Sequence, residues 1–168
     1  MIYTQQFRSP LGIITLASNE NALLGLWFEG QKYFGDTLSK NHTQGQTQVL
    51  ADTQTWLEIY FSGEIPPFTP ALSLQTTPFR QSVWEILLTI PYGKVMTYKE
   101  IAEKLAAQRG IAKMSAQAVG GAVSHNSISL IIPCHRVIGS DKSLIDYAGG
   151  LERKEWLLEL ESKSKRKA

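Results

Sequence analysis

The sequence predicts an α+β protein built in two parts, on the basis of three observations. Short runs rich in β-branched residues come first, four of the seven prolines fall between residues 64 and 78, and stretches with helical periodicity follow. Because proline removes a backbone donor and interrupts helices, the proline-rich segment is predicted to be a linker. We therefore expect one domain over residues 1–75 and a second over residues 76–168.

The first part is predicted to be a small sheet with one helix. Three strand-like runs are separated by turn-forming residues, which favours antiparallel pairing. The runs are residues 2–7, 12–17 and 22–28. Apolar positions along residues 46–61, among them Tyr60, have helical spacing and predict a helix that ends at Gly63.

The second part begins with clear helix-boundary signals. Thr77 followed by Pro78 suits the N-cap and first turn of a helix, which the segment 91–93 would stop. Thr97 and Glu100 have the spacing of a capping box, which predicts the start of a second helix.

A third helix is predicted from Ser115 to about Asn126, followed by a buried strand at residues 128–132 and a hairpin-like wing at residues 136–147. This order of elements is typical of a winged helix-turn-helix domain. A generic helical bundle is the alternative interpretation.

The composition is that of a globular chain, with 168 residues, 43% of them hydrophobic and one of them cysteine. Disordered, collagen-like and disulfide-rich classes are excluded. The apolar runs are too short to cross a bilayer and the first residues lack a secretory signal. We expect a cytoplasmic protein with no membrane partner, and nothing requires more than a monomer.

Charge is distributed unevenly along the chain. Residues 1–75 carry 3 basic and 6 acidic side chains, whereas residues 76–168 carry 14 and 9. An anionic partner such as nucleic acid would suit the second part, although solvated surfaces also reach this charge by chance.

The third predicted helix carries several small residues. They are Ala118, Gly120, Gly121 and Ala122. Each helical glycine costs about 1 kcal/mol relative to alanine, so the pattern needs a reason. Close approach to a DNA groove and close packing against a neighbouring helix both explain it.

The single cysteine, Cys134, directly follows the predicted buried strand. Its neighbours His135 and Arg136 supply charge that can lower a thiol pKa, which would make Cys134 a nucleophile. Adjacent residues of a strand face opposite sides, so His135 would need a turn or a bridging water to act on the thiol. A buried structural cysteine is the simpler interpretation of these residues alone.

Other polar residues have structural interpretations of their own. The three histidines and one cysteine lack metal-ligand spacing, so no metal site is expected. Tyr98 covers the core or touches phosphate, Asn126 ends a helix, and Glu161 is a solvated carboxylate on the last helix. The basic end at residues 163–167 is predicted to be a disordered tail.

Three segments together resemble the methylated-DNA–protein-cysteine methyltransferases, also called O6-alkylguanine-DNA alkyltransferases. They are Ala118 to Val123 with Asn126, Pro133 to Val137, and Tyr147 to Leu151 with Lys154 to Leu158. The resemblance is dense from Phe79 to Glu161 and general over residues 1–75. It implies a small RNase H-like α/β domain followed by a winged helix-turn-helix DNA-binding domain.

The resemblance also implies a reaction that uses each molecule once. Members of the family extrude an O6-alkylated guanine from double-stranded DNA, and a cysteine takes the alkyl group without a cofactor. By position, Cys134 would be the nucleophile, His135 the base acting through a water, and Glu161 the residue that orients His135. Tyr98 would donate to the guanine oxygen and Asn126 would pack beneath the active-site turn.

The resemblance assigns the remaining residues to a substrate pocket and a minor-groove surface. The pocket set is Val137, Tyr147, Ala148 and Gly149. The DNA-binding set is Gln117, Ala118, Gly120, Gly121, Ala122, Tyr98 and Arg136.

The sequence departs from the family pattern at three places. Gln117 stands where many members place an arginine that fills the gap left by the flipped base, which predicts weaker DNA binding. Ala148 replaces a serine that some members offer to the substrate oxygen. The segment 108–114, between the second and third helices, is longer than in many relatives.

Two other functions are compatible with parts of the sequence. A non-catalytic lesion-binding or regulatory helix-turn-helix protein would bind DNA without transfer, but relatives of that kind lack a cysteine at the position of Cys134. A cysteine hydrolase would need an oxyanion hole, and the sequence has no pattern for one.

Overall fold

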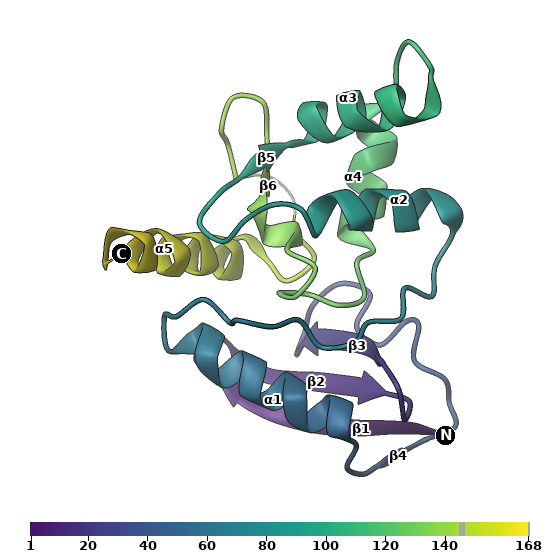
Figure 1. Cartoon of the computed structure of the whole chain (residues 1–168), viewed down its shortest axis with the longest axis vertical. Coiled ribbons are helices and arrows are strands. Elements are labelled where there is room, and N and C mark those ends of the chain that lie inside the picture. The colour runs from purple at the N-terminus through teal and green to yellow at the C-terminus, as the bar shows by residue number, and fades with distance from the viewer. Residues whose placement is uncertain (145–146, 168) are drawn as a thin grey trace.

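The computed structural model describes residues 1–144 and 147–167, with the backbone alone from residue 164 onward. Figure 1 shows a sheet domain and a helical domain joined by an extended segment. The elements are β1 (Ile2–Ser9), β2 (Gly12–Ser18), β3 (Leu23–Phe28), β4 (His42–Gln44), α1 (Gln48–Phe61), α2 (Pro78–Leu87), β5 (Met96–Thr97), α3 (Tyr98–Arg109), α4 (Ala116–Ser124), the 3-10 helix η1 (Cys134–Arg136), β6 (Val137–Ile138) and α5 (Leu151–Lys167). No helix in these ranges is long and apolar enough to span a membrane.

The N-terminal sheet has the order β3-β2-β1-β4. The predicted antiparallel pairing of β1, β2 and β3 is confirmed, and β4 adds a short parallel strand to β1 that the sequence did not predict. α1 lies across one face of the sheet (Figure 1). It begins where the Thr47 hydroxyl accepts from the backbone N–H of Leu50, at 3.0 Å.

The helix-boundary predictions of the second part are confirmed at their starts. Thr77 caps α2, and Thr97 with Glu100 forms the reciprocal capping box of α3. Ser115 caps α4, which packs against both α2 and α3. α2 ends at Leu87, before the predicted stop at residues 91–93.

The predicted buried strand of the second part is wrong. Residues 128–132 are buried but form turns, with Leu130 at a positive φ of 71° and a single bridge from Ile128 to Leu26. β6 pairs in parallel with β5, and after it the chain turns back, with the N–H of Gly139 donating to the Ser143 carbonyl at 3.0 Å. Residues 145 and 146 of the predicted wing lie outside the described residues. Residues 128–132 are all apolar except Ser129, so their sequence pattern could not separate a strand from a buried turn.

The C-terminal end also differs from its prediction. The segment 163–167 continues α5 as helical backbone, where a disordered tail was expected.

The two domains share backbone hydrogen bonds next to the cysteine-containing turn. The N–H of Leu26 in β3 donates to Ser127 at 2.8 Å, and the N–H of Ser129 donates back to Leu26 at 3.1 Å. Arg153 of α5 donates to the carbonyls of Leu11 and Glu29 in the first domain at 3.1 and 2.9 Å. The sheet therefore supports the segment that leads to Cys134.

Candidate active site

Asn126 holds the turn that positions Cys134. Its Nδ2 donates to the carbonyl of Ile132 at 2.8 Å, and its Oδ1 accepts from the N–H of Ile128 at 3.0 Å. These bonds replace the strand ladder that the sequence predicted, and the chain then enters η1 at Cys134. The strand geometry that would have turned Cys134 and His135 to opposite sides does not apply.

The Cys134 thiol is 3% exposed. Burial raises its pKa, while a hydrogen bond with Asn126 and the positive charge of Lys154 oppose the rise. Lys154 is itself fully buried on α5. The expectation of a lowered thiol pKa is therefore wrong for the protein without DNA, and Cys134 needs a base to become a thiolate.

The two imidazole nitrogens of His135 differ in their hydrogen bonding. Its Nε2 lies 2.6 Å from Oε2 of Glu161, and its Nδ1 is buried without a hydrogen-bond partner among the described residues. Burial lowers the pKa of His135, and the attraction of Glu161 only partly offsets this. A neutral imidazole that donates from Nε2 has its lone pair on Nδ1, where it can accept a proton.

Glu161 is the centre of a buried hydrogen-bond network, although the sequence suggested a solvated carboxylate. Oε2 accepts from the hydroxyl of Tyr60 at 2.7 Å as well as facing His135, and Oε1 accepts from Arg136 Nε at 2.8 Å and Gly93 N at 3.0 Å. Burial raises the pKa of Glu161, but the charges and hydrogen bonds of His135 and Arg136 outweigh it and lower the pKa overall. Glu161 is ionised at neutral pH.

Arg136 lies inside this network and not on a DNA-facing surface. Its side chain is buried, and Nη1 donates to the carbonyl of Ile90 at 2.7 Å while the other donors bind Glu161. Its predicted place in the DNA-binding set is corrected, because its donors are used within the protein.

The predicted pocket residues are largely buried. Val137, Tyr147 and Ala148 are 7% exposed or less, and the Tyr147 pKa is raised mainly by burial and next by the proximity of Cys134. A Cβ on Gly149 would lie 2.6 Å from the Tyr147 ring, so only glycine allows this approach. The effect of Cys134 on the pKa of Tyr147 indicates that the Tyr147 side chain lies close to the thiol.

The predicted DNA-binding residues divide into an exposed group and a buried one. Tyr98, Gln117, Gly120 and Gly121 line a hollow of about 640 Å³ between α3, α4 and the residues that follow β6. Ala118 is exposed next to it. Ala122 faces inward, and its carbonyl accepts from the Trp84 indole at 2.8 Å, so its side chain is removed from the predicted surface.

The two explanations of the small residues apply to different positions, because Ala122 packs internally whereas Gly121 has open space around it. A Cβ at this position would meet no described atom within 4 Å, so no neighbouring helix requires glycine here. The open space favours close approach by an external surface over internal packing.

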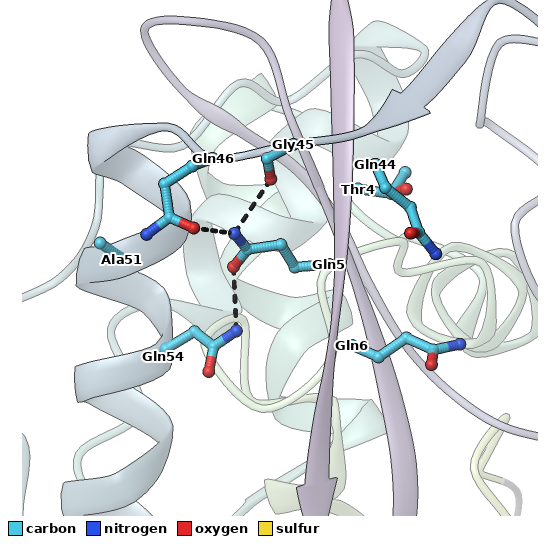
Figure 2. A pocket seen from close by; sticks show the side chains of 8 residues that line it. All are labelled: Thr4, Gln5, Gln6, Gln44, Gly45, Gln46, Ala51 and Gln54. Carbon is cyan, nitrogen blue, oxygen red and sulfur yellow. Dashed lines mark hydrogen bonds between the residues drawn. The ribbon is translucent and has the colours of Figure 1, made fainter.

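A separate polar hollow of about 800 Å³ lies between β1, β4 and α1 (Figure 2). Glutamine side chains line it and bond to one another: Gln54 donates to Gln5 Oε1 at 2.9 Å, and Gln5 donates to the Gly45 carbonyl at 2.9 Å. These bonds join α1 to the sheet, and the hollow contains no predicted site residue.

The last two observations on the site concern metal ligands and Tyr60. No cluster of metal-ligating side chains occurs among the described residues. Tyr60 was expected to be a core residue, and its contact with Glu161 was not predicted. The one signal in the sequence was its hydroxyl on a mainly apolar helix face.

Family models, curated sequences and solved structures that match this chain come from one protein family. The family model of the 6-O-methylguanine DNA methyltransferase ribonuclease-like domain matches residues 2–74, and that of the DNA binding domain matches residues 78–163. The methylated-DNA–protein-cysteine methyltransferase of Mycobacterium tuberculosis is 41% identical over 161 residues, which cover 96% of this chain and 93% of the relative. That of Methanosarcina barkeri is 38% identical over 179 residues, which cover 98% and 100%. A crystal structure of Mycobacterium tuberculosis OGT in complex with DNA is similar at a TM-score of 0.84 and 39% identity, covering 96% and 94% of the two chains.

Proposed function

The chain belongs to the family of methylated-DNA–protein-cysteine methyltransferases, and we propose that it repairs DNA by moving the alkyl group of an O6-alkylguanine onto Cys134. The ribonuclease-like domain comes first and the DNA-binding domain second, as the matching family models indicate. We place the boundary between them at residue 75, within the proline-rich segment.

The observation that carries the proposal is the arrangement around His135. Glu161 holds Nε2, and Nδ1 has no hydrogen-bond partner in the part of the chain that the structure describes. His135 directly follows the buried Cys134 in η1. In the proposed reaction the thiol proton moves through a water to Nδ1. The sulfur then forms a bond to the alkyl carbon, the carbon–O6 bond breaks, and its electron pair stays on the guanine oxygen.

The leaving oxygen needs a donor as negative charge develops on it. We assign this role to Tyr98, which begins α3 and lines the hollow that also contains Gly120 and Gly121. The product is a thioether, which thiol exchange does not reverse, so each molecule reacts once. No cofactor enters this scheme because the protein is itself the alkyl acceptor.

The proposed partner is double-stranded DNA bound through its minor groove, with the damaged base flipped out of the helix. The open space over Gly121 supports close approach of a groove to α4. We propose that the protein acts as a monomer in the cytoplasm, and its single free cysteine is compatible with a reducing compartment.

Intact-protein mass spectrometry tests the proposal. Wild-type protein and Cys134→Ser are each mixed with duplex DNA carrying one O6-methylguanine, and a second duplex carries O4-methylthymine. The wild type is expected to gain one methyl group, located on Cys134, and to stop after one equivalent. Tight lesion binding without any mass gain would instead identify a lesion-binding protein and reject the transfer function.

A further inference from the structure

Tyr60 brings a hydroxyl group from the first domain into the proton-relay network of the second. It lies on α1 and is fully buried, with its hydroxyl 2.7 Å from Glu161 Oε2 and 3.5 Å from His135 Nε2. The ring stacks on Trp56 at 5.2 Å between centroids and meets Tyr92 edge-on at 5.9 Å. These contacts fix the direction in which the hydroxyl points.

The direction of the hydrogen bond from Tyr60 is also fixed. Burial, and next the charge of Glu161, raise the pKa of Tyr60 well above its usual value, so it keeps its proton. Glu161 is ionised and can only accept. The one hydroxyl proton of Tyr60 is directed to Glu161 and is unavailable to His135.

This arrangement determines which imidazole nitrogen of His135 is protonated. Nε2 faces a carboxylate oxygen and a hydroxyl oxygen that has given its proton elsewhere, so Nε2 must be the donor. Nδ1 then has the free lone pair that the transfer reaction needs.

We propose that Tyr60 is a positioning residue for alkyl transfer, whose hydroxyl holds Glu161 and His135 in the orientation that leaves Nδ1 free to accept the Cys134 proton. The inference rests on the proposed function. It gives the ribonuclease-like domain a direct part in the chemistry of the other domain.

The charges around His135 set the expected effect of removing this hydroxyl. Glu161 faces Nε2, Arg136 and Lys154 place positive charge nearby, and Tyr60 with Tyr92 packs beside the network. Without the Tyr60 hydroxyl, less of the Glu161 charge is compensated and Oε2 attracts the imidazolium more strongly. The pKa of His135 therefore rises, and neutral His135 requires a higher pH.

The test is Tyr60→Phe, which keeps the ring and removes the hydroxyl. Single-turnover methyl transfer from saturating O6-methylguanine duplex is measured against pH. We expect a rate constant about tenfold lower, the size of effect for a hydrogen bond to a charged group, and an ascending limb shifted to higher pH. Lesion-duplex affinity, measured with Cys134→Ser and the double variant, should be unchanged.

Tyr3→Phe is the matched control, because Tyr3 is a partly buried tyrosine of β1 outside the network. It should have the wild-type rate and pH profile. A wild-type profile for Tyr60→Phe would overturn the inference. So would a loss of thermal stability and DNA affinity without a shift in the pH profile, because that is the signature of a structural role alone.

A second readout separates the inference from the proposed function. Alkylation of Cys134 by iodoacetamide needs no DNA, and its pH dependence should differ between wild type and Tyr60→Phe. Identical iodoacetamide profiles would reject the role of Tyr60. Failure of the wild type to accept methyl from DNA would reject the proposed function and leave the iodoacetamide comparison to decide on Tyr60.

Discussion

Arg136 and Glu161 meet through two parallel hydrogen bonds, with Nε 2.8 Å from Oε1 and Nη2 3.1 Å from Oε2. Both side chains are buried, and the third donor of the guanidinium binds the Ile90 carbonyl at 2.7 Å. A planar guanidinium fits this arrangement and a lysine ammonium does not. Together with His135, Arg136 lowers the pKa of the Glu161 carboxyl in a place where burial alone would raise it.

Arg136→Lys is expected to lower the free energy of unfolding by about 2 kcal/mol, since the charge remains but the two-point geometry is lost. Urea unfolding measures this loss, with Arg8→Lys on the exposed side of β1 as the control. The affinity of the folded protein for duplex DNA should not change. Weaker DNA binding at unchanged stability would place Arg136 on the DNA instead.

Gly121→Ala is expected to have opposite effects on folding and DNA binding. An alanine here meets no described neighbour and gains up to about 1 kcal/mol of helix propensity, so the protein should become more stable. The added methyl group occupies the space into which we place the groove, so affinity for duplex DNA should fall. Thermal unfolding and a binding titration measure the two effects. Thr55→Ala, on the exposed side of α1, should stabilise without weakening DNA binding. Unchanged DNA affinity in Gly121→Ala would contradict the groove assignment.

Gln117→Arg should strengthen DNA binding and steepen its salt dependence. An added positive charge that neutralises one phosphate of the bound DNA changes the slope of log K against log salt by about −0.9. The measurement is a titration of lesion duplex at several salt concentrations, with Gln48→Arg at the start of α1 as a control for added charge. Equal slopes for wild type and Gln117→Arg would count against a role of position 117 at the DNA.

Stability should fall in two steps as the pH decreases. Burial lowers the pKa of His135 from its usual 6.5, so below that pH the unfolded chain binds a proton that the folded protein excludes. Glu161 has a lowered pKa in the folded state, and its contribution is present above pH 4.5 and is lost as the pH falls further. Urea unfolding over a pH series measures both steps. His135→Gln should remove the step at higher pH. The control His42→Gln changes an exposed histidine and should retain that step. A wild-type stability that does not change from neutral pH to pH 4.5 would contradict the assignment of the upper step to His135.

Local signals in the sequence predicted the elements that local interactions determine. Thr97 and Glu100 satisfy each other's backbone donors within one turn, so their spacing alone identified the start of α3. The segment 128–132 was misassigned because its shape depends on Asn126 and on hydrogen bonds with β3. The hydrogen-bond partners in β3 are distant in sequence. No periodicity in the sequence reveals that the side chain of Asn126 bonds to this segment.

The same distinction applies to the site. Resemblance to a family identified Cys134, His135 and Glu161, and the structure brings His135 and Glu161 into contact. The contact between Tyr60 and Glu161 spans 101 positions of sequence, and a tyrosine on an apolar helix face is usually a core residue. The proposed role of Tyr60 depends on the packing of the two domains, which the sequence of α1 or of α5 alone does not determine.

The burial of Cys134 bears on how many molecules remain available for repair. A protein that reacts once is inactivated by whichever electrophile or oxidant reaches its sulfur first. A protonated thiol that is 3% exposed reacts slowly with cellular oxidants and small alkylating agents. We therefore expect Cys134 to react faster with a damaged base delivered by DNA than with small reagents, so that lesions deplete the active protein more than general chemical stress does.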